Sequence, residues 1–122
     1  MSSQLWETQE GAMINWERVE ELRNEVGPED FEEVIELFLE KVDDTIGRLG
    51  QTEAEPSLEE QLHFLKGSAL NIGFGVFADL CQNGETAAAK GRAGDIDLDA
   101  IRIAYAEARQ EFLDKTHRVK AA

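Results

Sequence analysis

A continuous apolar stripe between Pro28 and Gly50 constrains the fold of this chain more than any other feature. The apolar residues recur three and four positions apart, which is the spacing of one face of an α-helix. They are Phe31, Val34, Ile35, Phe38, Val42, Ile46 and Leu49. Acidic residues at the start of the segment suit the positive end of the helix dipole. A helix of this kind gains most of its stability by burying that face, so the segment predicts packing against other helices.

Two shorter segments carry clear helix start signals. Asn15 can cap a short first helix, which Gly27 and Pro28 end, with Pro28 opening the next helix. The apolar positions of that first helix are Val19, Leu22 and Val26. Ser57 and Glu60 form a capping-box pattern ahead of a third helix, after a polar linker over residues 51–55.

The remaining helices have less sharply marked ends. Gly73 and Gly75 interrupt or end the third helix, and Asp95 or Asp97 can cap the last one after a break over residues 91–94. The residues expected on the inner face of the fourth helix are Phe77, Leu80, Cys81, Gly84, Ala87 or Ala88, and Gly91. The last helix is expected to bury Leu98, Ile101, Tyr105, Ala108 and Phe112.

These segments predict an all-α protein. Short connections between the longer helices favour an antiparallel up-and-down four-helix bundle, with an additional short N-terminal helix across one end. A chain of 122 residues is large enough for one core. We therefore expect a polar N-terminal tail over residues 1–14 and a single bundle domain over residues 15–122.

The charge of the chain is large and uneven. Residues 1–60 hold 18 acidic and 4 basic side chains, whereas residues 61–122 hold 8 of each. The acidic half is most simply a solvated surface that aids solubility. A net charge of −14 disfavours nucleic-acid binding and offers no polybasic membrane anchor.

Other classes of site receive no support. Cys81 is the single cysteine, so an internal disulfide is excluded, and two distant histidines give no metal-ligand spacing. The sequence has no signal-peptide pattern, no apolar run of about 18 residues and no glycine-rich phosphate loop. We expect a cytoplasmic protein that binds no metal and no ATP.

The run from His63 to Gly73 is unusual for a core helix. The buried seam of this helix is expected to contain Leu58, Leu62, Leu65, Ala69 and Ile72. His63 and Gly67 point away from that seam and Lys66 flanks it. An exposed neutral imidazole is a competent nucleophile, and a nearby ammonium could stabilise a phosphoryl group during transfer. A glycine inside a helix costs about 1 kcal/mol, so Gly67 suggests that a partner must approach closely.

This run resembles the signature of histidine-containing phosphotransfer domains, a histidine followed by leucine, lysine, glycine and small residues. The matching residues are His63, Leu65, Lys66, Gly67, Ser68, Ala69 and Gly73. The resemblance implies a monomeric four-helix bundle that accepts a phosphoryl group on His63 and has Lys66 as charge partner. It implies response-regulator receiver domains or a hybrid histidine kinase as partners. It also implies no cofactor of its own, since Mg²⁺ would be bound by the receiver.

One position departs from the family pattern. Many members have a glutamine 22 positions after the histidine that bonds the imidazole, and this chain has Glu85 there, with Gln82 one turn earlier. A carboxylate could accept the Nδ1–H bond and favour attack by Nε2, but it would also repel a phosphoryl group. Either Glu85 or Gln82 could orient the ring, and the small Ser68 is a supporting candidate.

Leu70 and Phe64 are candidates for partner binding. Leu70 falls on the same outer side as His63 and Gly67, and Phe64 falls on the opposite flank. An apolar patch beside the histidine would suit a receiver domain. Alternatively, Phe64 packs under the first helix.

The sequence thus predicts a free-standing phosphorelay intermediate with no turnover of its own. A second hypothesis is a helical adaptor that regulates a partner by binding alone, without phosphorylation. A third is the dimerising histidine hairpin of a kinase-like phosphotransferase, which would require a stable homodimer.

Overall fold

The chain forms five α-helices and one short 3₁₀ turn in the residues that the computed structural model describes, which are 13–51 and 57–121, with side chains as far as Thr116. The helices are α2 (Trp16–Val26), α3 (Pro28–Arg48), α4 (Leu58–Ile72), α5 (Gly75–Ala89) and α6 (Leu98–Ala121), and the 3₁₀ turn is η1 (Ala93–Asp95). The predicted all-α class is confirmed. Most of the predicted tail over residues 1–14 and of the linker over residues 51–55 lies outside the described residues.

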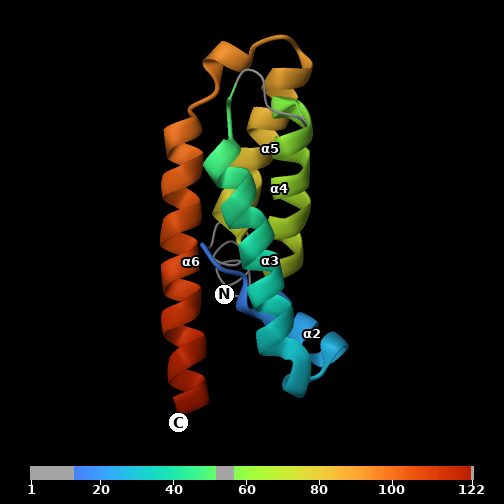
Figure 1. Ribbon diagram of the computed structural model, residues 1–122, viewed down its shortest axis with the longest axis vertical. Helices are drawn as coiled ribbons and strands as arrows, with labels where there is room; N and C mark the ends of the chain where they lie inside the picture. The colour runs from blue at the N-terminus through green and yellow to red at the C-terminus, as the bar shows by residue number, and fades with distance from the viewer. Residues whose placement is uncertain (1–12, 52–56, 122) are drawn as a thin grey trace, which may run out of the picture.

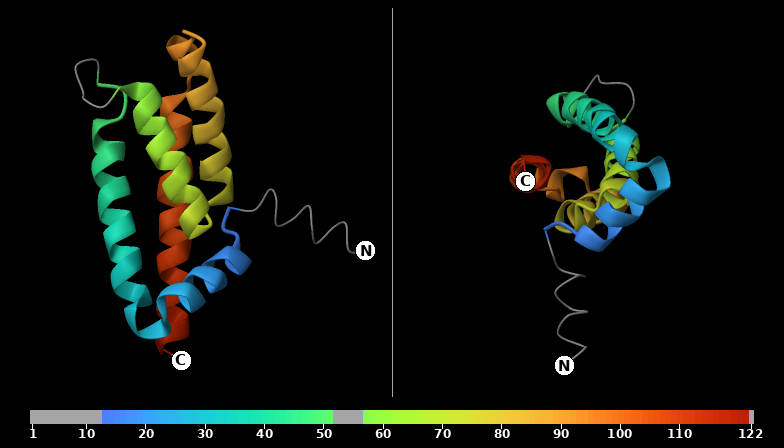
Figure 2. Two further views of the ribbon diagram at one scale, coloured as in Figure 1. Left: turned by 90° about the vertical axis from the view of Figure 1, so that its right-hand side faces the viewer. Right: turned by 90° about the horizontal axis from the view of Figure 1, so that it is seen from below.

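Four long helices run alternately up and down, as predicted. Figure 1 shows α3, α4, α5 and α6 side by side, with the shorter α4 and α5 stopping well before the C-terminal end of α6. The short helix α2 crosses one end of the bundle obliquely, as the turned view in Figure 2 shows. The histidine run therefore lies on the second helix of the bundle, α4.

Local signals set the ends of α4. At its start, the Ser57 hydroxyl accepts a bond from the Glu60 backbone N–H, and the Glu60 carboxylate accepts one from the Ser57 N–H. At its end, Gly73 takes a left-handed conformation with φ of +84°, which favours glycine. The capping box and the glycine stop were both predicted, because each depends only on neighbouring residues.

The other helix starts also follow the sequence. The Asn15 side chain accepts a bond from the Arg18 N–H at the start of α2. Asp97 accepts a bond of 3.0 Å from the Ala100 N–H, so Asp97 caps α6. Asp95 instead lies in the turn η1, which was not predicted.

The core contains the predicted seam of α4 together with an aromatic cluster. Leu62, Leu65, Ala69 and Ile72 are each no more than 1% exposed. The rings of Trp16 and Phe112 stack with their centroids 5.8 Å apart, and Phe74 meets Phe112 edge-on at 5.7 Å. Packing of this kind joins α2, α4, α5 and α6 into one core.

Two expectations about burial are wrong. Gly91 is exposed rather than part of the inner face of α5, because the helix ends at Ala89 and Gly91 takes a φ of +74° in the following turn. Ile14 was expected in the tail, yet it is 4% exposed and belongs to the core. The packed part of the chain therefore begins before Asn15.

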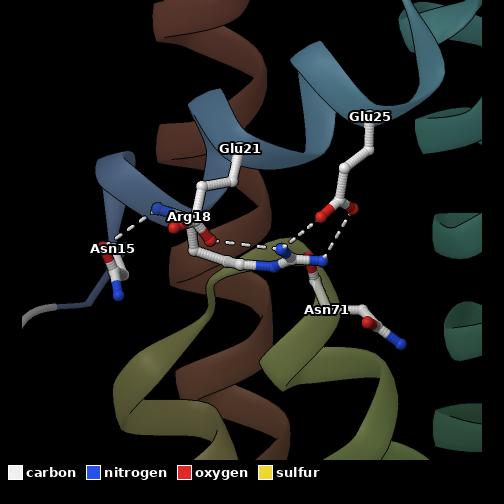
Figure 3. Close-up of polar contacts among 5 residues, drawn as sticks. All are labelled: Asn15, Arg18, Glu21, Glu25 and Asn71. Carbon is white, nitrogen blue, oxygen red and sulfur yellow. Dashed lines mark hydrogen bonds and ion pairs between the residues drawn. The ribbon is translucent and has the colours of Figure 1, made fainter.

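Helix α2 is bound to the C-terminal end of α4. The Asn15 N–H donates to the carbonyl of Gly73 at 2.6 Å, and Nε of Arg18 donates to the carbonyl of Asn71 at 3.0 Å. Figure 3 shows that the Arg18 guanidinium lies between the end of α4 and the carboxylates of Glu21 and Glu25, with which it pairs. These contacts satisfy carbonyls that the end of α4 would otherwise leave unpaired.

We expect the substitution Gly73→Ala to destabilise the bundle. The alanine must adopt a positive φ, and its Cβ would lie 2.8 Å from the Asn15 carbonyl oxygen, where α2 joins α4. The combined conformational and packing cost is about 2–4 kcal/mol in the free energy of unfolding, measured by denaturant titration.

Gly91→Ala is the matched control. Its φ is also positive, at +74°, but a Cβ there meets nothing within 4 Å. It should cost only about 1–2 kcal/mol, which is the conformational term. Equal losses in the two variants would show that the contact between α2 and α4 is unimportant.

Candidate functional site

His63 lies in the first half of α4 and faces solvent, as predicted. Its side chain is 69% exposed, while its neighbour Leu62 is fully buried. The buried stripe of α4 therefore turns the imidazole outward, and a second protein can reach it.

Glu85 of α5 is in direct contact with the ring. Its Oε2 lies 2.8 Å from Nδ1 of His63. An ionised carboxylate can only accept hydrogen bonds, so in this contact Nδ1 carries the proton and donates it. The other ring nitrogen, Nε2, has no polar partner among the residues that the structure describes. The neutral ring thus presents its lone pair at Nε2.

The same carboxylate also pairs with Lys66. Its Oε1 lies 2.8 Å from Nζ of Lys66, and both side chains are largely shielded, at 18% exposed for Glu85 and 21% for Lys66. The pKa of Glu85 is lowered, chiefly by the Lys66 ammonium; partial burial acts in the opposite direction, and the contact with His63 lowers the pKa further. Glu85 is therefore ionised at neutral pH, and it links the histidine to the lysine.

Close packing of α4 against α5 brings Glu85 to this position. A Cβ on Gly84 would lie 3.1 Å from Cδ1 of Leu62 and 3.4 Å from Cγ2 of Ile96. The residue next to Gly84 is Glu85, and the residue next to Leu62 is His63. The missing side chain at Gly84 therefore lets the two helices approach at the level where the site forms.

Gln82 does not contact the imidazole. Its Nε2 donates to Oγ1 of Thr86 at 3.1 Å on the exposed side of α5. Of the two candidates for orienting His63, the structure places only Glu85 against the ring. Ser68 is 7% exposed and faces the interior rather than the histidine side of α4.

Gly67 has no packing reason to be glycine. It is exposed in the middle of α4, its backbone is helical, and a Cβ there would meet nothing within 4 Å. The protein itself therefore has room for a side chain at this position, unlike at Gly84. The absence of one leaves open space on the helix surface one turn from His63.

Leu70 and Phe64 are two of the exposed large apolar side chains of the chain. Leu70 is 59% exposed and lies seven residues after His63, which is two turns along the same face. Phe64 is 39% exposed. It borders a groove together with Lys41, Asp44, Thr45, Arg48 and Gln61. The alternative that Phe64 packs under the first helix is thus wrong, because its neighbours belong to α3 and α4.

Two further buried side chains lie on the helices that carry the site. Gln61 is 1% exposed, and it donates to the Arg48 carbonyl and accepts from the Gly50 N–H, both at 3.4 Å. These bonds fix the start of α4 to the end of α3. In the sequence, the one sign that Gln61 would be buried is its position beside the apolar seam of α4. Cys81 is fully buried, and burial, with a smaller contribution from the charge of Glu85, raises the pKa of its thiol to about 12.

Two negative observations concern the described part of the chain. It contains no group of three or more His, Cys, Asp or Glu side chains placed to hold a metal ion. None of its helices combines the length and apolar character that a membrane span needs.

These features define a class of protein: a helical bundle that presents an exposed histidine held by a carboxylate from a neighbouring helix. The ring is exposed, its Nε2 has no polar partner in the described part of the chain, and an ammonium is close to the carboxylate that holds the ring. Such a site suits transfer of a phosphoryl group, which depends mainly on positioning and on nearby positive charge.

The family model of the Hpt domain matches residues 33–121, and the chain belongs to this family. Hpt domains are four-helix bundles that take part in histidine phosphotransfer in phosphorelays. They exchange phosphoryl groups with receiver domains and kinases, and they are carriers rather than catalytic enzymes in general. Searches of curated proteins and of solved structures found no significant match.

Proposed function

We propose that this chain is the intermediate carrier of a multistep phosphorelay and that His63 is its phosphoryl acceptor. The observation that supports this most directly is the 2.8 Å contact between Nδ1 of His63 and Glu85, on a ring that is 69% exposed. This contact leaves Nε2 as the nucleophile and turns it toward an incoming partner.

The proposed first step begins with a phosphorylated aspartate in a receiver domain. The Nε2 lone pair of His63 attacks phosphorus in line, the bond from phosphorus to the aspartyl oxygen breaks, and the aspartate leaves as a carboxylate. In the second step an unphosphorylated receiver aspartate attacks phosphorus, and the N–P bond breaks. The receiver would supply Mg²⁺ and its acidic pocket, while Lys66 would supply positive charge beside the phosphoryl oxygens.

We further propose that the receiver docks over the outer face of α4. Leu70 offers an apolar contact two turns from His63, and Phe64 offers another beside the groove against α3. Gly67 leaves the space that a receiver's active site needs to reach Nε2. A carrier of this kind acts as a monomer and forms short-lived complexes, because it must leave each partner after transfer.

The substitution His63→Gln should abolish labelling. We expect phosphorylated receiver domains from the same genome to transfer label to the wild-type chain, giving an acid-labile, base-stable adduct. Because the His63 side chain is exposed, the variant should keep its fold, and circular dichroism would check this. Acid-labile label on the variant would contradict the assignment of the site. No transfer from any receiver to the wild type, together with a complex that is insensitive to the substitution, would favour a binding-only adaptor.

The substitution Gly67→Ala should separate stability from function. Alanine at this open helical position should raise the free energy of unfolding by about 0.5–1 kcal/mol. The new methyl group would obstruct the receiver, so the transfer rate should fall. Gly47→Ala is the matched control, because Gly47 is also helical and exposed with nothing within 4 Å of a Cβ. It should stabilise the protein by a similar or smaller amount and leave transfer unchanged; equal transfer rates in the two variants would contradict the proposed approach over Gly67.

The substitution Leu70→Ser should weaken receiver binding. Removing an apolar side chain that becomes buried in the complex should raise Kd about 5–10-fold, measured by calorimetry with a receiver that labels the wild type. Ile103→Ser is the control, since Ile103 is 58% exposed, close to the 59% of Leu70, but lies on α6. If both variants bind the receiver equally well, the docking surface does not include Leu70.

A further inference from the structure

The groove between α3 and α4 carries positive charge in an otherwise acidic half of the chain. Its lining residues are Lys41, Asp44, Thr45, Arg48, Gln61 and Phe64. Lys41 and Arg48 are two of the four basic residues in residues 1–60, and the groove has one carboxylate. We propose that this basic groove selects among receiver domains and binds those that present a carboxylate beside an apolar side chain. The inference rests on the proposed function, in which the partner is a receiver domain.

One side of α3 lines the basic groove. Residues three or four apart share one side of a helix, and four residues in the second half of α3 follow this spacing. They are Leu37, Lys41, Asp44 and Arg48. All four are exposed, with Leu37 at 53%. Toward the start of α3 the same side is acidic, with Asp30 and Glu33, so its positive charge is confined to the part that faces Phe64.

The other exposed side of α3 is entirely acidic. Its members are Glu29, Glu32, Glu36, Glu40 and Asp43. This side turns toward α6, because Asp43 accepts a bond of 2.6 Å from the Tyr105 hydroxyl and another from Arg109. A partner that carries carboxylates is therefore repelled along one side of α3 and attracted along the other. Specificity often combines a favourable contact with an unfavourable one in this way.

Lys41 is the cation that is best placed to pair with a partner. Its ammonium has no ion-pair partner in residues 13–51 and 57–116, the part of the chain whose side chains the structure describes. Arg48, in contrast, pairs with Asp44 at 2.9 Å. The basic groove thus keeps one uncompensated positive charge, and a carboxylate on a docked surface can pair with it.

The basic groove lies close enough to His63 to belong to the same complex. Phe64 directly follows His63 on α4 and is 39% exposed where it borders the groove. Even a weak, transient complex buries about 500 Å² on each partner, which extends well beyond one histidine. A receiver that reaches Nε2 of His63 should therefore also meet Phe64 and the adjoining side of α3. The apolar side chains then supply buried area, and the cation decides which partner fits.

The test uses the receiver domain that labels the wild-type chain most rapidly. Lys41→Gln should raise the receiver concentration for half-maximal transfer about threefold, and Lys41→Glu about tenfold, because the second change adds repulsion to the loss of attraction. The transfer rate at saturating receiver should stay within about twofold of the wild-type rate, since Lys41 takes no part in the reaction. High salt should reduce the difference between the wild type and Lys41→Glu, because salt screens exposed charges.

Lys90→Glu is the matched control, because Lys90 is exposed and lies at the end of α5, outside the basic groove. It makes the same change in net charge and should leave the half-maximal concentration within about twofold of the wild-type value. Equal effects of Lys41→Glu and Lys90→Glu would show that net charge alone matters and would overturn the proposal. A wild-type dimer in sedimentation that Lys41→Glu dissociates, with receiver binding unchanged, would also overturn it, because a second copy would then occupy the groove.

The outcomes also separate this inference from the proposed function. If no receiver labels the wild-type chain, the proposed function fails, and this inference fails with it. If receivers label the wild type and Lys41→Glu with equal half-maximal concentrations, the proposed function stands and the role of the basic groove is refuted.

Discussion

The close approach of α5 to α4 at Gly84 is the contact on which the site depends. A side chain at Gly84 would press against the buried Leu62, so glycine lets the helices come together there. The adjacent residues on the two helices, Glu85 and His63, are thereby brought to hydrogen-bonding distance. The imidazole is exposed but not free, because a side chain from a different helix holds one of its nitrogens.

Helix α4, which carries His63, is held by specific contacts at both of its ends. Helix α4 is fixed at its start by the Ser57 capping box and by Gln61, and at its end by Gly73 and the contacts from α2. These interactions use backbone groups that a helix end would otherwise leave unpaired. In the proposed reaction, the well-held helix and the contact with Glu85 would help to orient the imidazole for in-line transfer with a separate protein.

The uneven distribution of charge along the chain is compatible with a site that receives a phosphoryl group. The acidic excess lies in the first 60 residues, whereas the half that contains His63, Lys66 and Glu85 has equal numbers of acids and bases. Within the site, the carboxylate and the ammonium form a neutral pair. In the proposed reaction, an anionic phosphoryl group would therefore meet a histidine whose immediate surroundings are balanced in charge, on a chain with a net charge of −14.

The helices, most of their ends and the outward direction of His63 all follow from patterns along the chain. These depend on spacing along one helix and on caps such as Ser57 and Gly73, which are local effects. Three contacts of the site could not be read from those patterns: Glu85 rather than Gln82 meets the ring, Phe64 borders a groove against α3, and Lys66 pairs with the same carboxylate. These contacts join residues on different helices, or depend on how two helices are set against each other. Their distances follow from how closely the helices pack, and no pattern within a single helix contains that information.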